Sequence, residues 1–136
     1  MSTRSYIGYV DKDNKIHFSY CHFDGYLAGV GETLLNYYNS SDRAIKLVDG
    51  GDMSSLDKDG ADYYENIKTN LKVVDINEFN EILQDSWCEY CYLYDKEWVY
   101  KELGEDGWGD MSHWDKLEDK FDKVVVTKYK LKEEEN

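Results

Sequence analysis

Two pairs of alternating segments constrain the fold more than any other feature of this sequence. Residues 5–10 and 15–20 alternate between apolar and polar side chains, and the polar residues 11–14 join them. Residues 87–94 and 97–101 repeat the arrangement around a two-residue turn. Alternation marks a strand with one buried face, and a short polar connection between two such strands marks a hairpin. The sequence therefore predicts an antiparallel sheet that is built from hairpins.

Apolar residues at a spacing of three to four predict helices between and after the hairpins. An Asp followed three residues later by Glu resembles a capping box, and a Ser before a periodic stretch is a candidate N-cap. The predicted helices are residues 30–38, residues 42–49 with Ser41 as cap and Gly50 as stop, a helix opened by the capping box 75–78, and a helix capped by Ser112 that carries Trp114, Leu117 and Phe121.

The remaining segments complete a single predicted domain. Residues 50–60 are rich in Gly, Ser and Asp and predict a loop, while residues 66–74 and 124–131 predict strands. We expect one domain over residues 1–131 and a frayed tail over 132–136. Because the elements do not repeat as strand–helix–strand units, the expected fold class is α+β, with three or four helices packed on one face of the antiparallel sheet.

Composition places the chain among intracellular proteins that fold around their own core. The 136 residues include 41% hydrophobic residues and no proline. There is no long apolar run that would predict a membrane span and no apolar region near the N-terminus that would predict a signal peptide. Three cysteines, an odd number at irregular spacing, favour reduced thiols over a disulfide framework. We therefore expect a cytoplasmic protein.

Acidic residues are concentrated in the middle of the chain. The net charge is −13, and residues 49–122 carry 21 acidic and 7 basic side chains. Such a field repels nucleic acid and membrane surfaces and attracts basic protein surfaces. Direct binding to DNA or RNA is disfavoured, because phosphate contacts require Lys and Arg. Ordinary solvation of an acidic surface remains the plain alternative to a partner-binding role.

The string Tyr20-Cys-His-Phe-Asp-Gly-Tyr26 gathers a thiol, an imidazole and a carboxylate. Cys21, His22 and Asp24 are the residue types of a nucleophile with a base and an orienting group. Adjacent residues of a strand point to opposite faces, which argues against Cys21 and His22 as a catalytic pair. A structural turn and a binding motif formed by Tyr20, Cys21, His22, Asp24 and Tyr26 are the other interpretations.

Metal and cofactor sites are not predicted. Cys88 and Cys91 have the spacing of a zinc knuckle, and Cys21 with His22 would complete four ligands. However, residues 88–91 continue an alternating strand, and Glu89 and Tyr90 supply no turn between the two cysteines. The acidic loops lack the ligand spacing of a calcium-binding hand, and no glycine-rich phosphate loop is present.

Aromatic residues interleaved with carboxylates mark the second candidate surface. Tyr and Trp are frequent anchors of protein interfaces. A core on one face and solvent on the other is the alternative. The residues assigned to this predicted acidic-aromatic surface are Glu97, Trp98, Glu105, Asp106, Trp108 and Asp110.

Four segments of the N-terminal part form a recognisable set: residues 2–8, the Y-C-H-F-D-G-Y string at 20–26, Gly31 with the Leu and Tyr doublets that follow it, and residues 51–56. With these segments the chain resembles a family of uncharacterised short proteins encoded by phages and prophages. The resemblance implies a phage accessory protein in a bacterial cytoplasm and brings no catalytic residues. The expected function is inhibition of a host protein, in defence or nucleic-acid handling, and DNA mimicry is one form of this expectation. A small-molecule or nucleotide-signal site at Cys21–Asp24, or a phage structural component, are the alternatives.

Overall fold

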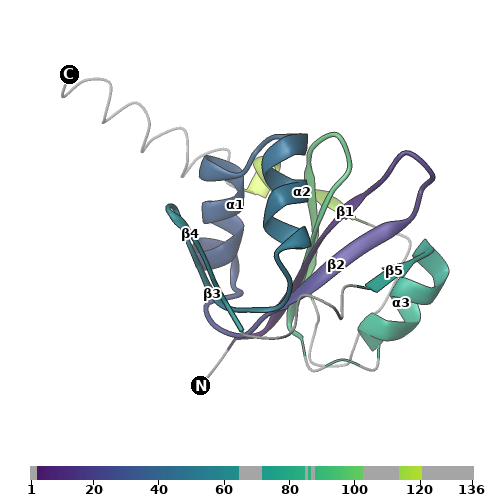
Figure 1. Ribbon diagram of the computed structural model, residues 1–136, viewed down its shortest axis with the longest axis horizontal. Helices are drawn as coiled ribbons and strands as arrows, with labels where there is room; N and C mark the ends of the chain where they lie inside the picture. The colour runs from purple at the N-terminus through teal and green to yellow at the C-terminus, as the bar shows by residue number, and fades with distance from the viewer. Residues whose placement is uncertain (1–2, 65–71, 85, 87, 103–113, 121–136) are drawn as a thin grey trace.

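The fold was determined as a computed structural model, which describes residues 3–64, 72–84, 86, 88–102 and 114–120 (Figure 1). Its elements in chain order are β1 (Ser5–Val10), β2 (Ile16–Cys21), the π-helical turn η1 (Leu27–Gly31), α1 (Glu32–Tyr37), α2 (Ser41–Asp49), β3 (Met53–Asp57), β4 (Gly60–Tyr63), β5 (Lys72–Val74), α3 (Ile76–Gln84), β6 (Tyr90–Tyr94), β7 (Trp98–Glu102), β8 (Asp115–Lys116) and α4 (Leu117–Lys120).

Both predicted hairpins are present. β1 pairs with β2 in antiparallel register, with Ile7 opposite Ser19, and β6 pairs with β7, with Tyr92 opposite Tyr100. Their turns contain the left-handed residues Asn14 and Lys96. The two hairpins lie side by side, and their turns leave the sheet at the same end (Figure 1). The alternation that predicted the hairpins also decides which side chains enter the core.

The sheet is mixed, so the prediction of an antiparallel sheet is wrong in part. Within the described residues, eight strands form one sheet in the order β4-β3-β2-β1-β6-β7-β8, and β5 pairs with β2. β1 and β6 are parallel, and so are β2 and β3, which meet at Cys21 and Met53. Helices separate both parallel pairs in the sequence, and such crossovers permit parallel pairing.

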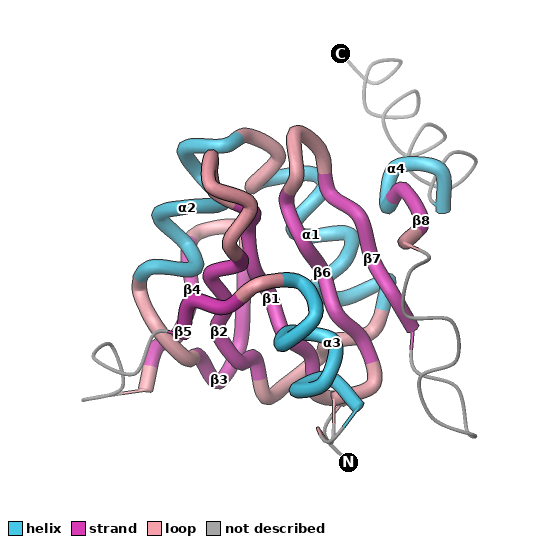
Figure 2. Tube along the Cα trace, turned by 90° about the vertical axis from the view of Figure 1, so that its right-hand side faces the viewer, coloured by secondary structure: helices cyan, strands magenta, loops and turns pink. Residues whose placement is uncertain are grey.

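Helices lie on both faces of the sheet, which corrects the expectation of one covered face (Figures 1 and 2). α1 and α2 cover one side, while α3 packs on the other. The larger cluster includes Ile7, Cys21, Leu34, Val48, Tyr92 and Trp98. The smaller cluster comprises Ile16, Phe18, Val74, Phe79, Leu83, Cys91 and Leu93. Burying both faces of the sheet gives a chain of this size two apolar layers.

Helix ends follow the predicted chemistry with small shifts. The Ser40 hydroxyl, and not Ser41, caps α2 by accepting a bond from the Arg43 backbone N–H at 3.2 Å. Gly50 ends this helix as predicted. The Asp75 carboxylate accepts the Glu78 backbone N–H at 2.8 Å and opens α3. Both caps satisfy donors that a helix start leaves without partners.

The predicted loop over residues 50–60 is wrong, because β3 and the start of β4 occupy it. Pairing of Leu56 with Ala61 forms a hairpin with an irregularity between Met53 and Ser55. Of the strand predicted at 66–74, the structure describes β5. The strand predicted at 124–131, Ser112 and the tail lie outside the described residues. Each helix of the described ranges is too short or too polar to cross a bilayer.

Candidate functional site

The Tyr20–Tyr26 string forms a joint where four parts of the fold meet. β2 ends at Cys21, and the backbone N–H groups of His22 and Phe23 donate to Met53 and Ser54. Gly25 is buried, its N–H donates to Thr3, and its carbonyl accepts the Tyr92 hydroxyl at 2.7 Å. The backbone of the string therefore connects the chain before β1 with β3, η1 and β6.

Two glycines of this joint allow close backbone approach. A Cβ on Gly25 would lie 2.8 Å from the Thr3 carbonyl oxygen, and one on Gly29 would lie 2.3 Å from the Asp24 carbonyl oxygen. Asp24 itself adopts a φ of 59°, a region that side chains other than Asn and Asp seldom enter. The Asp-Gly pair is thus required by the turn, as the structural interpretation of the string predicts.

Cys21 is not placed to act as a nucleophile. Its side chain is fully buried in the larger cluster, and its thiol donates to the Phe23 carbonyl at 3.6 Å. Burial raises the pKa of the Cys21 thiol to about 12, so the reactive thiolate is scarce at neutral pH. The chemical use of this residue is packing.

The remaining polar groups of the string bond to different tyrosines. The Tyr20 hydroxyl and the His22 Nδ1 atom are 2.7 Å apart, and the Tyr26 hydroxyl donates to the Asp24 carboxylate at 3.3 Å. Phe23 and Tyr26 are 45% and 42% exposed. This arrangement pairs the imidazole and the carboxylate each with a tyrosine hydroxyl and presents two aromatic rings to solvent. A binding role of the string therefore stays a prediction.

Trp98, the aromatic residue of the predicted acidic-aromatic surface that the structure describes, is buried. Trp98 is 1% exposed, lies in the larger cluster and donates from its indole nitrogen to the Tyr38 carbonyl at 3.1 Å. The assignment of Trp98 to a contact surface is wrong, because Trp98 begins β7 with its side chain on the face that α1 covers, whereas Glu97 belongs to the turn before the strand. Glu97 pairs with Lys116 at 3.8 Å. The other members, Glu105, Asp106, Trp108 and Asp110, lie outside the described residues.

The cysteines do not assemble into a metal site in the described part of the chain, where no group of three or more His, Cys, Asp or Glu residues could hold an ion. Cys88 and Cys91 are buried, and Cys91 lies in the smaller cluster, opposite to Cys21. Burial raises the pKa of Cys88 to about 12 and that of Cys91 well above its usual value.

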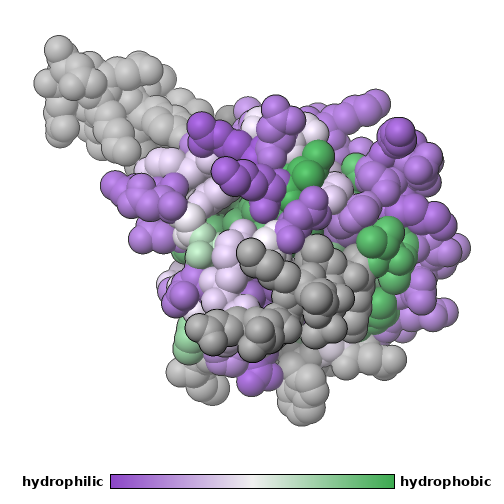
Figure 3. Space-filling model, in the orientation of Figure 1, coloured by the Kyte–Doolittle hydropathy of each residue, from purple (hydrophilic) through white to green (hydrophobic). Residues whose placement is uncertain are grey.

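A patch of exposed aliphatic and acidic side chains surrounds β5 and the start of α3. Val73 is 51% exposed and Ile76 is 41% exposed, the highest values among the large aliphatic residues that the structure describes. Asp75, Glu78 and Glu81 of the same segment are also exposed, and α3 contains no basic residue. Figure 3 shows apolar side chains over β5 and α3 next to hydrophilic ones. We call Val73, Asp75, Ile76, Glu78 and Glu81 the α3 patch.

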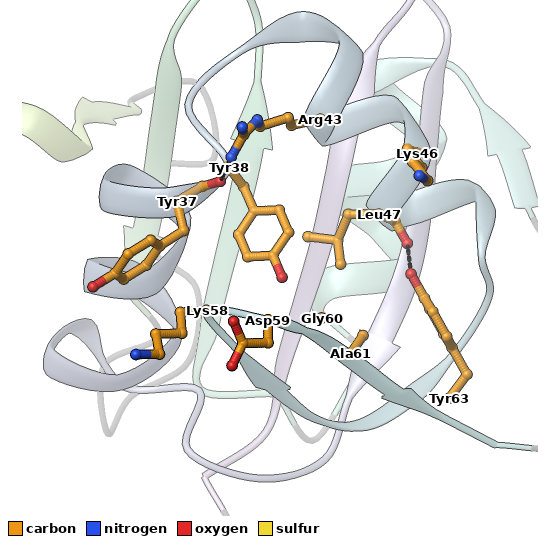
Figure 4. A pocket seen from close by; sticks show the side chains of 10 residues that line it. All are labelled: Tyr37, Tyr38, Arg43, Lys46, Leu47, Lys58, Asp59, Gly60, Ala61 and Tyr63. Carbon is orange, nitrogen blue, oxygen red and sulfur yellow. Dashed lines mark hydrogen bonds between the residues drawn. The ribbon is translucent and has the colours of Figure 1, made fainter.

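A pocket on the other side of the sheet was not predicted from the sequence. It lies between the end of α1, α2 and the β3–β4 hairpin, with a volume of about 490 Å³ (Figure 4). Its lining consists of Tyr37, Tyr38, Arg43, Lys46, Leu47, Lys58, Asp59, Gly60, Ala61 and Tyr63. The pairing of β3 with β4 creates this wall, so the prediction of a loop there concealed the pocket.

Comparison of the chain with protein-family models, with curated proteins and with solved structures gives no match. The functional assignment therefore rests on the geometry and charge of this chain.

Proposed function

We propose that this chain is a phage accessory protein that binds a basic surface of a host protein and blocks it. The observation that carries the proposal is an excess of 29 acidic over 16 basic side chains, which pairing within the chain cannot cancel. Between residues that the structure describes, the ion pairs within 4 Å are His17–Asp11 and Lys116–Glu97. The net charge is −13. Such a field accelerates encounter with a basic partner and disfavours acidic ones.

The α3 patch supplies a contact surface for such a partner. Val73 and Ile76 offer apolar area whose burial favours association, at about 25 cal/mol per Å² before the costs of binding. Glu78 and Glu81 offer carboxylates to Lys and Arg side chains of the partner. Among the described residues, the α3 patch takes the place of Trp98 as the proposed contact surface for the partner. Phe23 and Tyr26 provide further aromatic contacts at the joint.

The test is a comparison of two charge-reversed variants in a pull-down from bacterial lysate with elution by a salt gradient. Glu78→Lys/Glu81→Lys changes the α3 patch but keeps the Asp75 cap of the helix. Asp13→Lys/Asp95→Lys makes the same change in net charge at exposed positions of the two hairpin turns. We expect a basic protein to be retained by the wild type and the control variant and lost by the patch variant.

The magnitude follows from the coupling of close charge pairs across interfaces, which is about 1.5 kcal/mol or more for each pair. The patch variant should therefore bind the partner at least about tenfold more weakly than the control variant. Equal retention by the two variants would show that the α3 patch is not the contact surface. Loss of retention in both variants to the same extent would show that net charge alone acts, without a defined site.

DNA mimicry is the finer form of the proposal and has its own readout. If the carboxylates occupy the nucleic-acid site of the partner, duplex DNA and this chain compete for it, and the partner's activity on DNA falls as this chain is added. A ternary complex with DNA would indicate binding elsewhere on the partner. Presence of the chain in purified virions would instead favour a structural role in the particle.

A further inference from the structure

The pocket beside α2 concentrates positive charge in an acidic protein. Its lining contains Arg43, Lys46 and Lys58 but one carboxylate, that of Asp59. Neither lysine has an ion-pair partner among the residues described, since those pairs involve His17 and Lys116. Basic groups still outnumber carboxylates at this hollow when the nearby Asp57 is counted with Asp59, and on a chain of net charge −13 this local excess favours an anionic ligand.

The walls of the pocket are fixed by hydrogen bonds that cross between elements. The Tyr38 hydroxyl donates to the Asp57 carbonyl at 2.7 Å, and the Tyr63 hydroxyl donates to the Leu47 carbonyl at 2.6 Å. Arg43 donates from Nη1 to the Tyr37 carbonyl at 2.8 Å. These bonds hold α1, α2 and the β3–β4 hairpin together, so a ligand finds the hollow already formed and less ordering opposes its binding.

Aromatic and apolar groups line the same hollow. Figure 4 places Tyr38 and Leu47 at the centre, Tyr63 on one side, and Tyr37 above Lys58 on the other. Tyr37 is 38% exposed, so part of its ring is open to a flat ligand. Tyrosine rings stack on planar groups and Leu contributes apolar contact. The volume of about 490 Å³ falls in the range of about 300–1,000 Å³ that is usual for small-molecule pockets.

The two basic residues of α2 and the carboxylate of Asp59 lie on opposite sides of the pocket. Arg43 and Lys46 lie on α2, while Asp59 lies at the tip of the β3–β4 hairpin across the Tyr38 ring (Figure 4). Burial and the nearby Asp57 and Asp59 raise the pKa of Tyr38, whereas Arg43 lowers it. An anionic group is therefore favoured at the α2 wall, and a hydrogen-bond donor is favoured near Asp59.

We propose that this pocket binds a small phosphorylated ligand with a planar ring, of the size of a nucleoside monophosphate. The phosphate contacts Arg43 and Lys46, Lys58 contributes at the mouth, and a donor on the ring edge faces Asp59. Guanidinium and ammonium groups bind phosphate through charge-assisted hydrogen bonds. This site goes beyond the proposed partner binding, because it uses other residues and a different ligand.

The first test is an amide NMR titration of the full chain with each of the four common nucleoside monophosphates and with inorganic phosphate. We expect at least one nucleotide to shift the resonances of residues 37–63 that line the pocket, with higher affinity than inorganic phosphate. No shift in the pocket with any nucleotide at millimolar concentration would overturn the proposal. Inorganic phosphate binding as tightly as every nucleotide would overturn the role of the planar ring.

Matched lysine variants test the role of the pocket charges. Lys46→Gln/Lys58→Gln removes two lining charges whose side chains hold no wall of the pocket, while Lys12→Gln/Lys15→Gln removes two exposed charges in the β1–β2 turn. We expect the pocket pair to weaken nucleotide binding roughly tenfold and the control pair to leave it within about twofold. Equal effects of the two pairs would reduce the binding to general charge attraction and overturn the site.

Discussion

Tyr92→Phe tests how far one hydrogen bond supports the joint formed by the Tyr20–Tyr26 string. Tyr92 is fully buried, and its hydroxyl donates to the Gly25 carbonyl at 2.7 Å. Burial raises the pKa of Tyr92 well above that of an ordinary tyrosine, so the hydroxyl is protonated and remains a donor at neutral pH. Phenylalanine keeps the ring and removes the donor alone, so the Gly25 carbonyl loses this partner without a large cavity.

The expected cost is the penalty for an unsatisfied buried acceptor, about 1–3 kcal/mol. Domains are stable by about 5–15 kcal/mol, so this loss is readily measured. In thermal unfolding it corresponds to a decrease in Tm of about 2–4 °C for each kcal/mol. Urea unfolding followed by circular dichroism should show a lower midpoint with an unchanged slope, because the area exposed on unfolding is the same.

Tyr90→Phe is the matched control for this measurement. Tyr90 lies on the same strand and stacks on Tyr92 with ring centroids 6.3 Å apart, but its hydroxyl donates to Glu102 at an exposed site, at 3.3 Å. Removal of this exposed bond should change stability by about 0.5 kcal/mol or less. If Tyr92→Phe costs no more than Tyr90→Phe, the bond to Gly25 does not stabilise the joint, and the structural interpretation of the string is wrong.

Three further predictions concern the backbone, the thiols and pH. Asp24→Ala should cost about 1 kcal/mol in urea unfolding because φ is 59° there, and Asp24→Gly should not; equal losses would contradict the argument from backbone strain. A thiol reagent should leave the three cysteines unmodified in the native protein at neutral pH and modify all of them in denaturant; fast native labelling would contradict their burial. The hydrogen bond from His17 is the main cause that lowers the pKa of Asp11 in the folded protein. Asp11→Asn should therefore reduce the free energy of unfolding at pH values above the ordinary Asp pKa of about 3.9, and the difference between variant and wild type should vanish as pH falls through the lower folded pKa. A difference that grows in acid would contradict this prediction.

Local sequence patterns were sufficient to predict the two main hairpins. Alternation of single residues predicts β1 with β2 and β6 with β7, because strand partners joined by a short turn need no information from elsewhere in the chain. The parallel pairing of β1 with β6 joins residues about 85 positions apart, for example Ile7 with Tyr92, and no local pattern specifies it. The position of α3 on the second face of the sheet also depends on this long-range order of the strands.

The β3–β4 hairpin shows where composition misleads. Residues 50–60 contain Gly, Ser and Asp, which favour turns, yet Met53 is buried and pairs with Cys21 at the end of β2. Neighbouring strands can draw a weak segment into a sheet, because strand preference depends strongly on context. The signal that could have indicated this hairpin was the Lys58-Asp59 turn, which is followed by Gly60 and lies between Leu56 and Ala61.

The candidate sites depended on side-chain direction, which sequence spacing leaves open. Glu97 and Trp98 are adjacent, and only the position of β7 in the sheet shows that Trp98 enters the core. The Tyr20–Tyr26 string was recognised as special, but its backbone contacts, and not its thiol, explain why. The pocket beside α2 combines residues from three segments, and no single segment carries its signature.

The proposed function is tested most directly by the salt dependence of affinity for the captured partner, measured for the wild type and for Glu78→Lys/Glu81→Lys. Wild-type affinity should fall steeply as salt rises, because screening weakens the contacts of the α3 patch. The variant should bind weakly at low salt and lose much less as salt rises. Equal affinities and equal slopes for the two proteins would contradict a binding function that acts through this acidic surface.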